Sequence, residues 1–362
     1  MTRHIFSQRF SWHKGAAMAF AAAVVLGTSA CGMSTASEIA GASSSSSASS
    51  CPVDVNTDVT GTIRIGWQMI PNADLIVKDK GWLEACMPNA TIQWSQFNSG
   101  ADVVQAFGSG SLDIAQMGSS PSVRAISAPL NLDVQVVWIH DVIGDAESLV
   151  ARDASVGSIK DLAGKNIATP FGSTSHFSLL SALDQAGMST SDVNLINLDP
   201  DKMAAAWTRG EIDAAWVWDP VLSTLKSDGG SVVMSSKDTA EQGSATYDME
   251  VASQSFITAN ASAMKTWTSV EDYAVGRISS DPDGAAESVA AQMSVDTSTV
   301  KTQFAGYEYP SASQQSTIFS AELPKVFKST AEFLKSQGSI DSVSADYASA
   351  LYSDAIDAVA GQ

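Results

Sequence analysis

The chain has 362 residues, of which 44% are hydrophobic, and 39 acidic residues outweigh 20 basic ones to give a formal net charge of −19. So acidic a chain is repelled by nucleic acid and by anionic lipid, and we expect no nucleic-acid partner. The length suits one large or two medium domains, and no hydrophobic run after residue 31 reaches the length of a membrane span.

Residues 1–30 have the layout of an export signal. Basic residues precede an apolar stretch at residues 15–27, and small residues then lead to Cys31. Cleavage before Cys31 would expose a cysteine that carries lipid, so we expect an extracytoplasmic protein anchored to the cell membrane through lipidated Cys31. Thr28 stands where bacterial lipidation sites usually have Leu, and plain secretion is therefore the alternative.

A serine-rich segment follows Cys31. Residues 31–60 are predicted to form a flexible tether, because the Ser, Ala and Gly of this segment bury little apolar area. Two cysteines remain, Cys51 and Cys86. An even pair of cysteines in an oxidising compartment predicts a disulfide between them. Two buried free thiols are the alternative.

Strands and helices alternate from about Gly61 onward, first up to residue 117 and again from residue 166 to residue 218. This alternation predicts sheets of mostly parallel strands with helices on their faces. The expected strands are residues 62–67, 91–94, 113–117, 166–169, 193–198 and 212–218. The expected helices between them are residues 75–86, 102–107, 176–186 and 202–208. Beyond residue 255 the chain reads as polar helices near residues 268–278, 283–292, 297–304, 312–335 and 343–359.

A short pattern recurs one hundred residues along the chain. Residues 106–115 read Ala-Phe-Gly-Ser-Gly-Ser-Leu-Asp-Ile-Ala, and residues 206–215 read Ala-Trp-Thr-Arg-Gly-Glu-Ile-Asp-Ala-Ala. In both segments a helix is expected to end at a glycine, and a turn that carries an aspartate is expected to start a buried strand. The repeat indicates two lobes of similar build.

The inventory of reactive residues disfavours an enzyme. After residue 31 only His140 and His176 are available, and no Cys-x-x-Cys, His-x-Asp or His-Glu-x-x-His spacing occurs, so a metal hydrolase or an iron oxygenase lacks ligands. No Gly-x-Ser-x-Gly nucleophile motif or phosphate loop is present either. We therefore expect no catalysis, no metal and no other cofactor.

Hydroxyl-rich segments follow two of the predicted strands and place hydroxyl groups and free amides at helix N-termini. Such ends favour an anion, because the helix dipole adds positive potential there. Helix capping without any function is the alternative. The residues concerned are Ser119 and Ser120 after the strand at residues 113–117, and Thr174, Ser175 and His176 after the strand that ends near Pro170.

Aromatic and acidic residues complete the candidate site. Trp216 and Trp218 alternate at the end of one strand and are expected on one face, where rings commonly wall a pocket; tryptophans of the core are the alternative. Glu147 and Asp248 each interrupt an expected crossover between the lobes and suit a cationic group. In a chain this acidic, carboxylates exposed to solvent are the alternative.

These motifs resemble those of the substrate-binding components of ABC importers for taurine, within the wider family of aliphatic-sulfonate and nitrate-type binding proteins. The resemblance covers roughly residues 61–350. It is carried by residues 97–100, Gly118-Ser119-Ser120-Pro121, Glu147-Ser148-Leu149-Val150, Asp161-Leu162-Ala163-Gly164-Lys165, residues 170–180, Ala205-Ala206-Trp207, residues 209–214, Val217-Trp218 and Phe333-Leu334-Lys335.

The resemblance implies an α/β, two-lobed type II periplasmic-binding fold in which each lobe is a mixed sheet flanked by helices and two crossover strands join the lobes. The first lobe is expected to comprise residues 61–146 and 249–362, and the second lobe residues 147–248. The protein, a monomer, would bind taurine or a close amino-sulfonate between the lobes and deliver it to an ABC permease. Another small organic anion, such as an alkylsulfonate, is the alternative ligand, and a sulfonate-processing enzyme is the alternative from another class.

The resemblance also implies roles for individual residues. The carboxylates of Glu147 and Asp248 would take the ammonium group, and Trp216 or Trp218 would pack on the two-carbon linker. Asp219 stands where the family usually has a small residue, so the choice among amino-sulfonates stays open. The sulfonate would be held by Ser119, Ser120, Thr174, Ser175 and His176, with help from Gln68.

Overall fold

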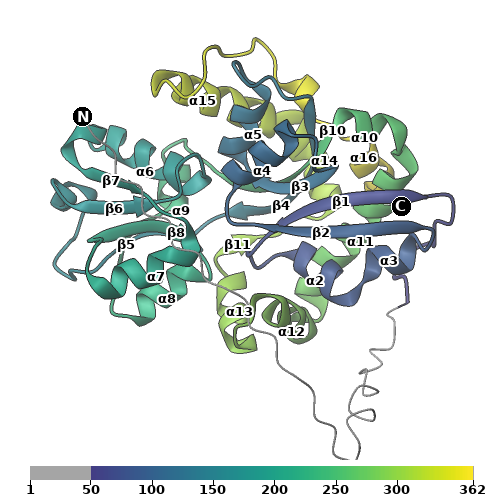
Figure 1. Ribbon diagram of the computed structural model, residues 1–362, viewed down its shortest axis with the longest axis horizontal. Helices are drawn as coiled ribbons and strands as arrows, with labels where there is room; N and C mark the ends of the chain where they lie inside the picture. The colour runs from purple at the N-terminus through teal and green to yellow at the C-terminus, as the bar shows by residue number, and fades with distance from the viewer. Residues whose placement is uncertain (1–49, 362) are drawn as a thin grey trace, which may run out of the picture. The chain divides into compact units, whose positions relative to one another are not determined.

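The computed structural model describes residues 50–361 (Figure 1). The predicted export signal, the lipidation candidate Cys31 and most of the predicted tether lie outside these residues. Among the helices of residues 50–361, none combines the length and the apolar character that a membrane span requires.

The first sheet has six strands in the order β11-β4-β10-β3-β1-β2. Its strand β1 pairs in parallel with β2 and β3, whereas β10 pairs antiparallel with both β3 and β4. Helices α4 and α5 cover one face near β3, while α2 packs with α11 and α12 on the other face (Figure 1). The strands are β1 (Gly61–Gln68), β2 (Ala90–Phe97), β3 (Ile114–Gly118), β4 (Val134–Ile143), β10 (Tyr247–Ser253) and β11 (Tyr307–Glu308).

The second sheet has five strands in the order β7-β6-β8-β5-β9. Here β6 pairs in parallel with β7 and β8, and β5 pairs antiparallel with β8 and β9. Each sheet therefore has three parallel strands followed by antiparallel ones, as the predicted mixed sheets require. The strands are β5 (Glu147–Ala151), β6 (Asn166–Thr169), β7 (Asn194–Asn197), β8 (Ala214–Trp218) and β9 (Ser231–Ser235).

Most of the predicted helices are present, with boundaries that shift by a few residues. Their apolar sides form three buried clusters, one on the six-stranded sheet and one on each face of the five-stranded sheet. The helices are α2 (Ala73–Lys80), α3 (Trp82–Cys86), α4 (Gly100–Gly108), α5 (Ser119–Ile126), α6 (Thr174–Gln185), α7 (Pro200–Arg209), α8 (Val221–Ser227), α9 (Ser236–Glu241), α10 (Gln254–Ala259), α11 (Ala261–Ser280), α12 (Pro282–Met293), α13 (Thr297–Phe304), α14 (Ala312–Thr317), α15 (Leu323–Ser336) and α16 (Asp354–Ala360).

The sequence repeat corresponds to one turn that is built twice. Gly110 and Gly210 both follow a helix and have positive φ angles of 68° and 73°, a conformation that glycine adopts without strain. Asp113 and Asp213 each accept a backbone hydrogen bond of 2.8 Å from the neighbouring parallel strand, β1 and β6 respectively. The prediction of two units of similar build is confirmed at this turn.

Two helix predictions are wrong in detail. The helix expected at residues 75–86 is two helices, because Gly81 between α2 and α3 has a φ angle of 61° and ends the first one. The helix expected at residues 343–359 forms only from Asp354. The chain before it is held extended against β4, where the amide of Tyr352 donates to the carbonyl of Val136 at 2.8 Å.

The folded body starts earlier than the predicted end of the tether. Cys51 and Cys86 form a disulfide, as the even pair of cysteines predicts. Asn56 is bonded as well, since its side-chain amide donates to the hydroxyls of Ser262 and Thr266 on α11 at 2.7 and 3.0 Å. Residues 51–60 are therefore fixed to the body and do not belong to the tether.

The two sheets are connected twice. Between β4 and β5 only residues 144–146 intervene, and the return connection from β9 to β10 passes through α9. Division of the chain into lobes at residues 146/147 and 248/249 stays a proposal, which the membership of the strands in the two sheets supports.

A candidate ligand-binding cavity

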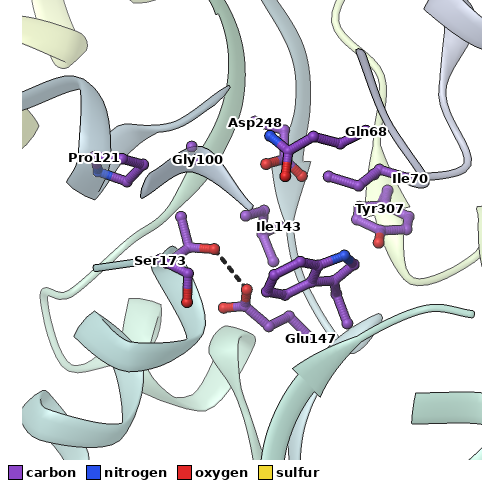
Figure 2. A pocket seen from close by; sticks show the side chains of 12 residues that line it. Gln68, Ile70, Gly100, Pro121, Ile143, Glu147, Ser173, Asp248 and Tyr307 are labelled. Carbon is purple, nitrogen blue, oxygen red and sulfur yellow. Dashed lines mark hydrogen bonds between the residues drawn. The ribbon is translucent and has the colours of Figure 1, made fainter. Parts of the chain in front are cut away.

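A small cavity of about 10 Å³ lies where the two sheets approach each other. This volume holds about one water molecule, so a larger ligand can enter only if the surrounding side chains or the two sheets move apart. Its lining residues are Gln68, Ile70, Gly100, Gly118, Pro121, Ile143, Glu147, Ser173, Thr174, Trp218, Asp248 and Tyr307 (Figure 2).

The ends of parallel strands build the walls. Gln68, Gly118 and Trp218 are the last residues of β1, β3 and β8, and in α/β sheets ligands bind outside the carboxyl ends of the strands. The side chain of Gln68 is fixed, because its Nε2 donates to the carbonyl of Gln116 at 3.0 Å. Of the predicted anion-binding residues, Gln68 and Thr174 line the cavity.

Two helix N-termini face the cavity, one from each sheet. Gly118 precedes α5, whose first turn has no side-chain cap, and Ser173 precedes α6 and caps it by accepting the amide of His176 at 3.2 Å. The two ends are in contact, since a Cβ atom added to Gly118 would collide with the side-chain methyl of Thr174. Their dipoles and free amides make this side of the cavity attractive to an anion.

Glu147 lines the cavity beside the N-terminus of α6 and is held by hydroxyl groups (Figure 2). Its Oε2 accepts from Thr174 at 2.6 Å, and its Oε1 accepts from Ser236 at 2.6 Å and from Ser178 at 3.4 Å. Burial raises the pKa of Glu147, and the hydroxyls of Ser236, Thr174, Ser175 and Ser178 oppose this rise by stabilising the carboxylate.

Asp248 points into the same space from the six-stranded sheet (Figure 2). Burial raises its pKa to about 8, with a further contribution from the negative charge of Glu147 and an opposing one from a hydrogen bond with Asp141. Asp141 is the cross-strand neighbour of Asp248 and is itself fully buried. Two carboxyl groups, Glu147 and Asp248, thus line the same cavity as two positive helix ends, and Asp141 lies next to Asp248.

The two tryptophans of the predicted site lie in different places. Trp218 lines the cavity and packs with Ile70 and Tyr307, whereas Trp216 is fully buried in the cluster on the other face of the five-stranded sheet, with Leu149. Trp216 therefore belongs to the core, and the expectation that both rings share a face is wrong. Trp218 is the last residue of β8, so no following strand residue holds its side chain to the alternation of the strand.

The other predicted ligand-binding residues lie around the cavity without lining it. Ser119, Ser120 and Ser175 are buried at the two helix N-termini. His176 stacks on Phe171 with ring centroids 4.5 Å apart, and its Nδ1 accepts the amide of Gly172 at 3.1 Å. Burial lowers the pKa of His176 to about 4, so the ring is neutral at pH 7.

Asp219 has a structural role. Its Oδ1 accepts the amide of Ser223 at 2.9 Å and the hydroxyl of Ser223 at 2.5 Å, which fixes the start of α8. Burial raises the pKa of Asp219, and the hydrogen bonds from Ser223 oppose the rise. The carboxylate of Asp219, which the sequence suggested could alter ligand choice, is therefore hydrogen-bonded to the helix that follows it.

Sequence reasoning missed Asp141 and Tyr307. Tyr307 lies on a strand of only two residues, too short to show any periodicity. Asp141 did leave a signal, because together with His140 it interrupts the otherwise apolar stretch Val136 to Ile143. A polar pair inside a buried strand needs partners, and such places are often functional.

Comparison with known families gives a match over the larger part of the chain. The family model described as NMT1/THI5 like matches residues 78–285, which is more than half of the 362 residues. The chain belongs to the NMT1/THI5-like family. A relative of this NMT1/THI5-like protein, the taurine-binding periplasmic protein of Escherichia coli (strain K12), is 33% identical over 264 residues, which are 71% of this chain and 81% of that protein.

Solved structures show the same fold for this NMT1/THI5-like protein. The alkanesulfonate-binding protein SsuA from Xanthomonas axonopodis pv. citri, bound to MOPS, gives a TM-score of 0.65 at 24% identity and covers 80% of this chain and 96% of that chain. The desulfurization enzyme DSZB gives a TM-score of 0.60 at 14% identity and covers 83% of this chain and 99% of that chain. At these identities the likeness concerns the fold alone. The family resemblance and the predicted fold class, two helix-flanked sheets of the periplasmic-binding type, are confirmed.

Proposed function

We propose that the protein binds taurine or a close amino-sulfonate in the cavity between the two sheets. The observation that carries this proposal is that one cavity is lined both by the N-termini of α5 and α6, which attract an anion, and by the buried carboxyl groups of Glu147 and Asp248. A zwitterion with an anionic and a cationic end complements both kinds of group at once.

The identity to the taurine-binding protein of Escherichia coli supports the same ligand class. In the proposed arrangement the amides and hydroxyls of Ser119 and Ser120 and the backbone amide of Thr174 hold the sulfonate, while the Thr174 hydroxyl donates to Glu147. Trp218 packs on the carbon linker. Gln68 borders the cavity from β1. Ser175 and His176 contribute through the shape of the first turn of α6.

An alkylsulfonate is the second candidate ligand, favoured by the fold likeness to the alkanesulfonate-binding protein SsuA. Such a ligand has no cation. It would leave Glu147 and Asp248 buried beside an apolar chain, and burying unpaired carboxyl groups costs free energy. The carboxyl groups therefore favour the amino-sulfonate.

The same proposal includes a cellular role. A binding protein of this kind would work outside the cytoplasm, as a monomer that hands its ligand to an ABC permease. Lipid on Cys31 would keep it beside the membrane. Mass spectrometry of the N-terminus of the native protein tests this anchor, and an unmodified Cys31 or a different cleavage site would contradict it.

Titration calorimetry tests the ligand. We expect taurine and hypotaurine to bind more tightly than ethanesulfonate, which lacks the ammonium group, and than β-alanine, which has a carboxylate in place of the sulfonate. Equal affinities for taurine and ethanesulfonate would contradict the role of the carboxyl groups.

The enzyme alternative is tested separately. DSZB has the same fold, so the fold does not decide between binding and catalysis. Among the lining residues of the cavity there is no His or Lys to activate Ser173 or Thr174 as a nucleophile. Incubation of the purified protein with taurine should therefore leave the compound unchanged, and sulfite release would overturn the binding proposal.

A further inference from the structure

Asp141 on β4 and Asp248 on β10 are direct cross-strand neighbours. Beyond this pair the register shifts, so that the next residue of β10, Met249, lies opposite Ile139 and not opposite His140. A bulge of this kind re-aims the side chains around it. Here it accompanies two carboxyl groups that lie together at the wall of the cavity.

The carboxyl group of Asp141 has no donor. Asp141 is fully buried, and no N–H or O–H group of residues 50–361 donates to either of its oxygens. The side-chain amide of Asn72 is near enough to lower the pKa of Asp141, but it does not reach normal hydrogen-bond geometry. A carboxylate ion in such a place is costly, so Asp141 keeps its proton.

Asp248 is the group placed to accept a hydrogen bond from that proton, because the two residues are direct cross-strand neighbours. A hydrogen bond between two carboxyl groups requires a proton on one of them. Both oxygens of Asp141 are buried, whereas Asp248 lines the cavity, so the arrangement favours Asp141 as the donor and Asp248 as the acceptor. Burial, together with the neighbouring Asp248 and Glu147, raises the pKa of Asp141 well above its ordinary value.

A second group at the cavity also lacks a partner. Tyr307 lines the cavity, and its phenol oxygen is buried without a hydrogen bond to any other residue that the structure describes (Figure 2). Burial raises the pKa of Tyr307 well above its ordinary value, so the phenol is neutral. Unpartnered polar groups in a closed wall indicate that a polar ligand completes this side of the cavity.

We propose that Asp141 is a positioning residue that determines specificity: its carboxyl O–H donates to Asp248 and holds the other oxygen of Asp248 toward the cationic group of a ligand. The inference rests on the proposed function, because it concerns the ammonium end of an amino-sulfonate. On binding, the ammonium N–H donates to Asp248 while the O–H bond of Asp141 stays intact. A proton carried by Asp248 leaves to the solvent.

Two variants test whether Asp141 acts as a hydrogen-bond donor. In Asp141→Asn the amide N–H replaces the O–H as donor to Asp248, whereas Asp141→Val removes the donor. Asp145→Asn is the matched control, because Asp145 is an exposed carboxylate of the same segment. Titration calorimetry measures the affinity of each full-length variant for taurine and for ethanesulfonate.

We expect Asp141→Val to weaken taurine binding about tenfold or more, in line with the loss of a hydrogen bond to a charged group. Asp141→Asn should stay within about threefold of the parent, and ethanesulfonate affinity should change little in either variant. A purely structural role would lower both affinities together. Equal loss in Asn and Val variants, or no loss in either, would overturn the proposal.

A measurement without ligand keeps this inference separate from the proposed function. Among the protonated carboxyl bands in infrared spectra of the empty protein at pH 7, one should be absent from Asp141→Asn and present in the Asp145→Asn control. If no band is lost, Asp141 is ionised and the inference fails whatever the protein binds. If the band is lost but neither sulfonate binds, the assignment of the ligand is wrong and the donor role of Asp141 stands.

Discussion

Glu147 is the carboxyl group that the protein itself engages most fully. Three hydroxyls donate to it, yet it lines the cavity and can accept a further donor from a ligand. The replacement Glu147→Gln keeps the shape of the side chain and removes its charge. Calorimetry should show taurine binding weakened by roughly 2 kcal/mol, because a buried charge pair would be broken.

The matched control for this prediction is Glu241→Gln, an exposed glutamate at the end of α9. Affinity for taurine should be unchanged in the control. Should Glu147→Gln weaken taurine and ethanesulfonate equally, Glu147 would serve only to hold the hydroxyls in place, and Asp248 alone would recognise the cation.

The disulfide joins the start of the folded body to the end of α3. It closes a loop with a sequence separation of 35 residues, and by the chain-entropy estimate such a loop stabilises a protein by about 3 to 4 kcal/mol. Replacing Cys51 and Cys86 together by alanine should lower the free energy of unfolding in urea by this amount.

Taurine affinity should be unaffected by this double replacement, because neither cysteine lines the cavity. A loss of stability well under 1 kcal/mol would mean that the unfolded chain already keeps this loop closed or that the fold does not need residues 51–60.

Elements with a strong local signal were predictable from the sequence. The strand at Asn166–Thr169 was placed to the residue, because the glycine turn at Gly164 precedes it and Pro170 follows it. The break at Gly81 was missed because the apolar spacing of residues 75–86 continues across it. Before α16 the sequence favoured a helix, but the chain pairs with β4 at Val136 and is extended there.

The candidate site was predictable in part. Glu147, Thr174 and Asp248 came from motifs at strand ends, and all three line the cavity. Asp141 and Tyr307 could not be found in this way, because each depends on a cross-strand partner or on a distant segment that approaches in the fold. Sequence patterns report local periodicity and say little about which distant side chains meet.

Contact between the two halves of the molecule is tight at Gly118. A methyl group there would collide with Thr174 on α6, from the other sheet. Gly118→Ala should therefore prevent full closure around a ligand and weaken taurine binding by about tenfold or more, at roughly 1.4 kcal/mol per tenfold. Small-angle scattering with taurine present should show a more open molecule.

Gly276→Ala is the matched control, since Gly276 has an ordinary helical position with no atom near the added methyl. It should bind taurine like the parent and be slightly more stable, because alanine favours helices over glycine. Unchanged affinity in Gly118→Ala would show that closure does not bring these two helix ends together.

Stability of the whole empty protein should fall as pH rises from 6.5 to 8. Burial raises the pKa of Asp74 to about 7 and that of Asp248 to about 8. The folded state holds these protons more tightly than the unfolded state, so their loss with rising pH destabilises the fold. Burial lowers the pKa of His140 to about 3 and that of His176 to about 4, so their opposite contribution lies mainly between these values and pH 6.5 and only its tail extends above.

Urea unfolding at pH 6.5 and pH 8 should differ by about 2 kcal/mol or more. Asp74 and Asp248 account for about 2 kcal/mol at 1.36 kcal/mol per pKa unit, and the raised pKa values of Asp141, Glu250 and Glu271 act in the same direction. Saturating taurine should reduce the difference, because the ammonium group stabilises ionised Asp248. Stability that rises between these pH values would contradict the raised pKa values.

The repeat also relates the two carboxyl groups of the cavity. Asp248 lies opposite Gly118 at the end of β3, and Glu147 lies opposite Trp218 at the end of β8, one hundred residues further along. Since β10 and β5 occupy the same place in their sheets, the two acids occupy equivalent positions in the two halves. Three hydroxyls surround Glu147, and a carboxyl group stands beside Asp248. With the proposed ligand, this difference between equivalent positions would let a nearly symmetrical frame distinguish the two ends of the molecule.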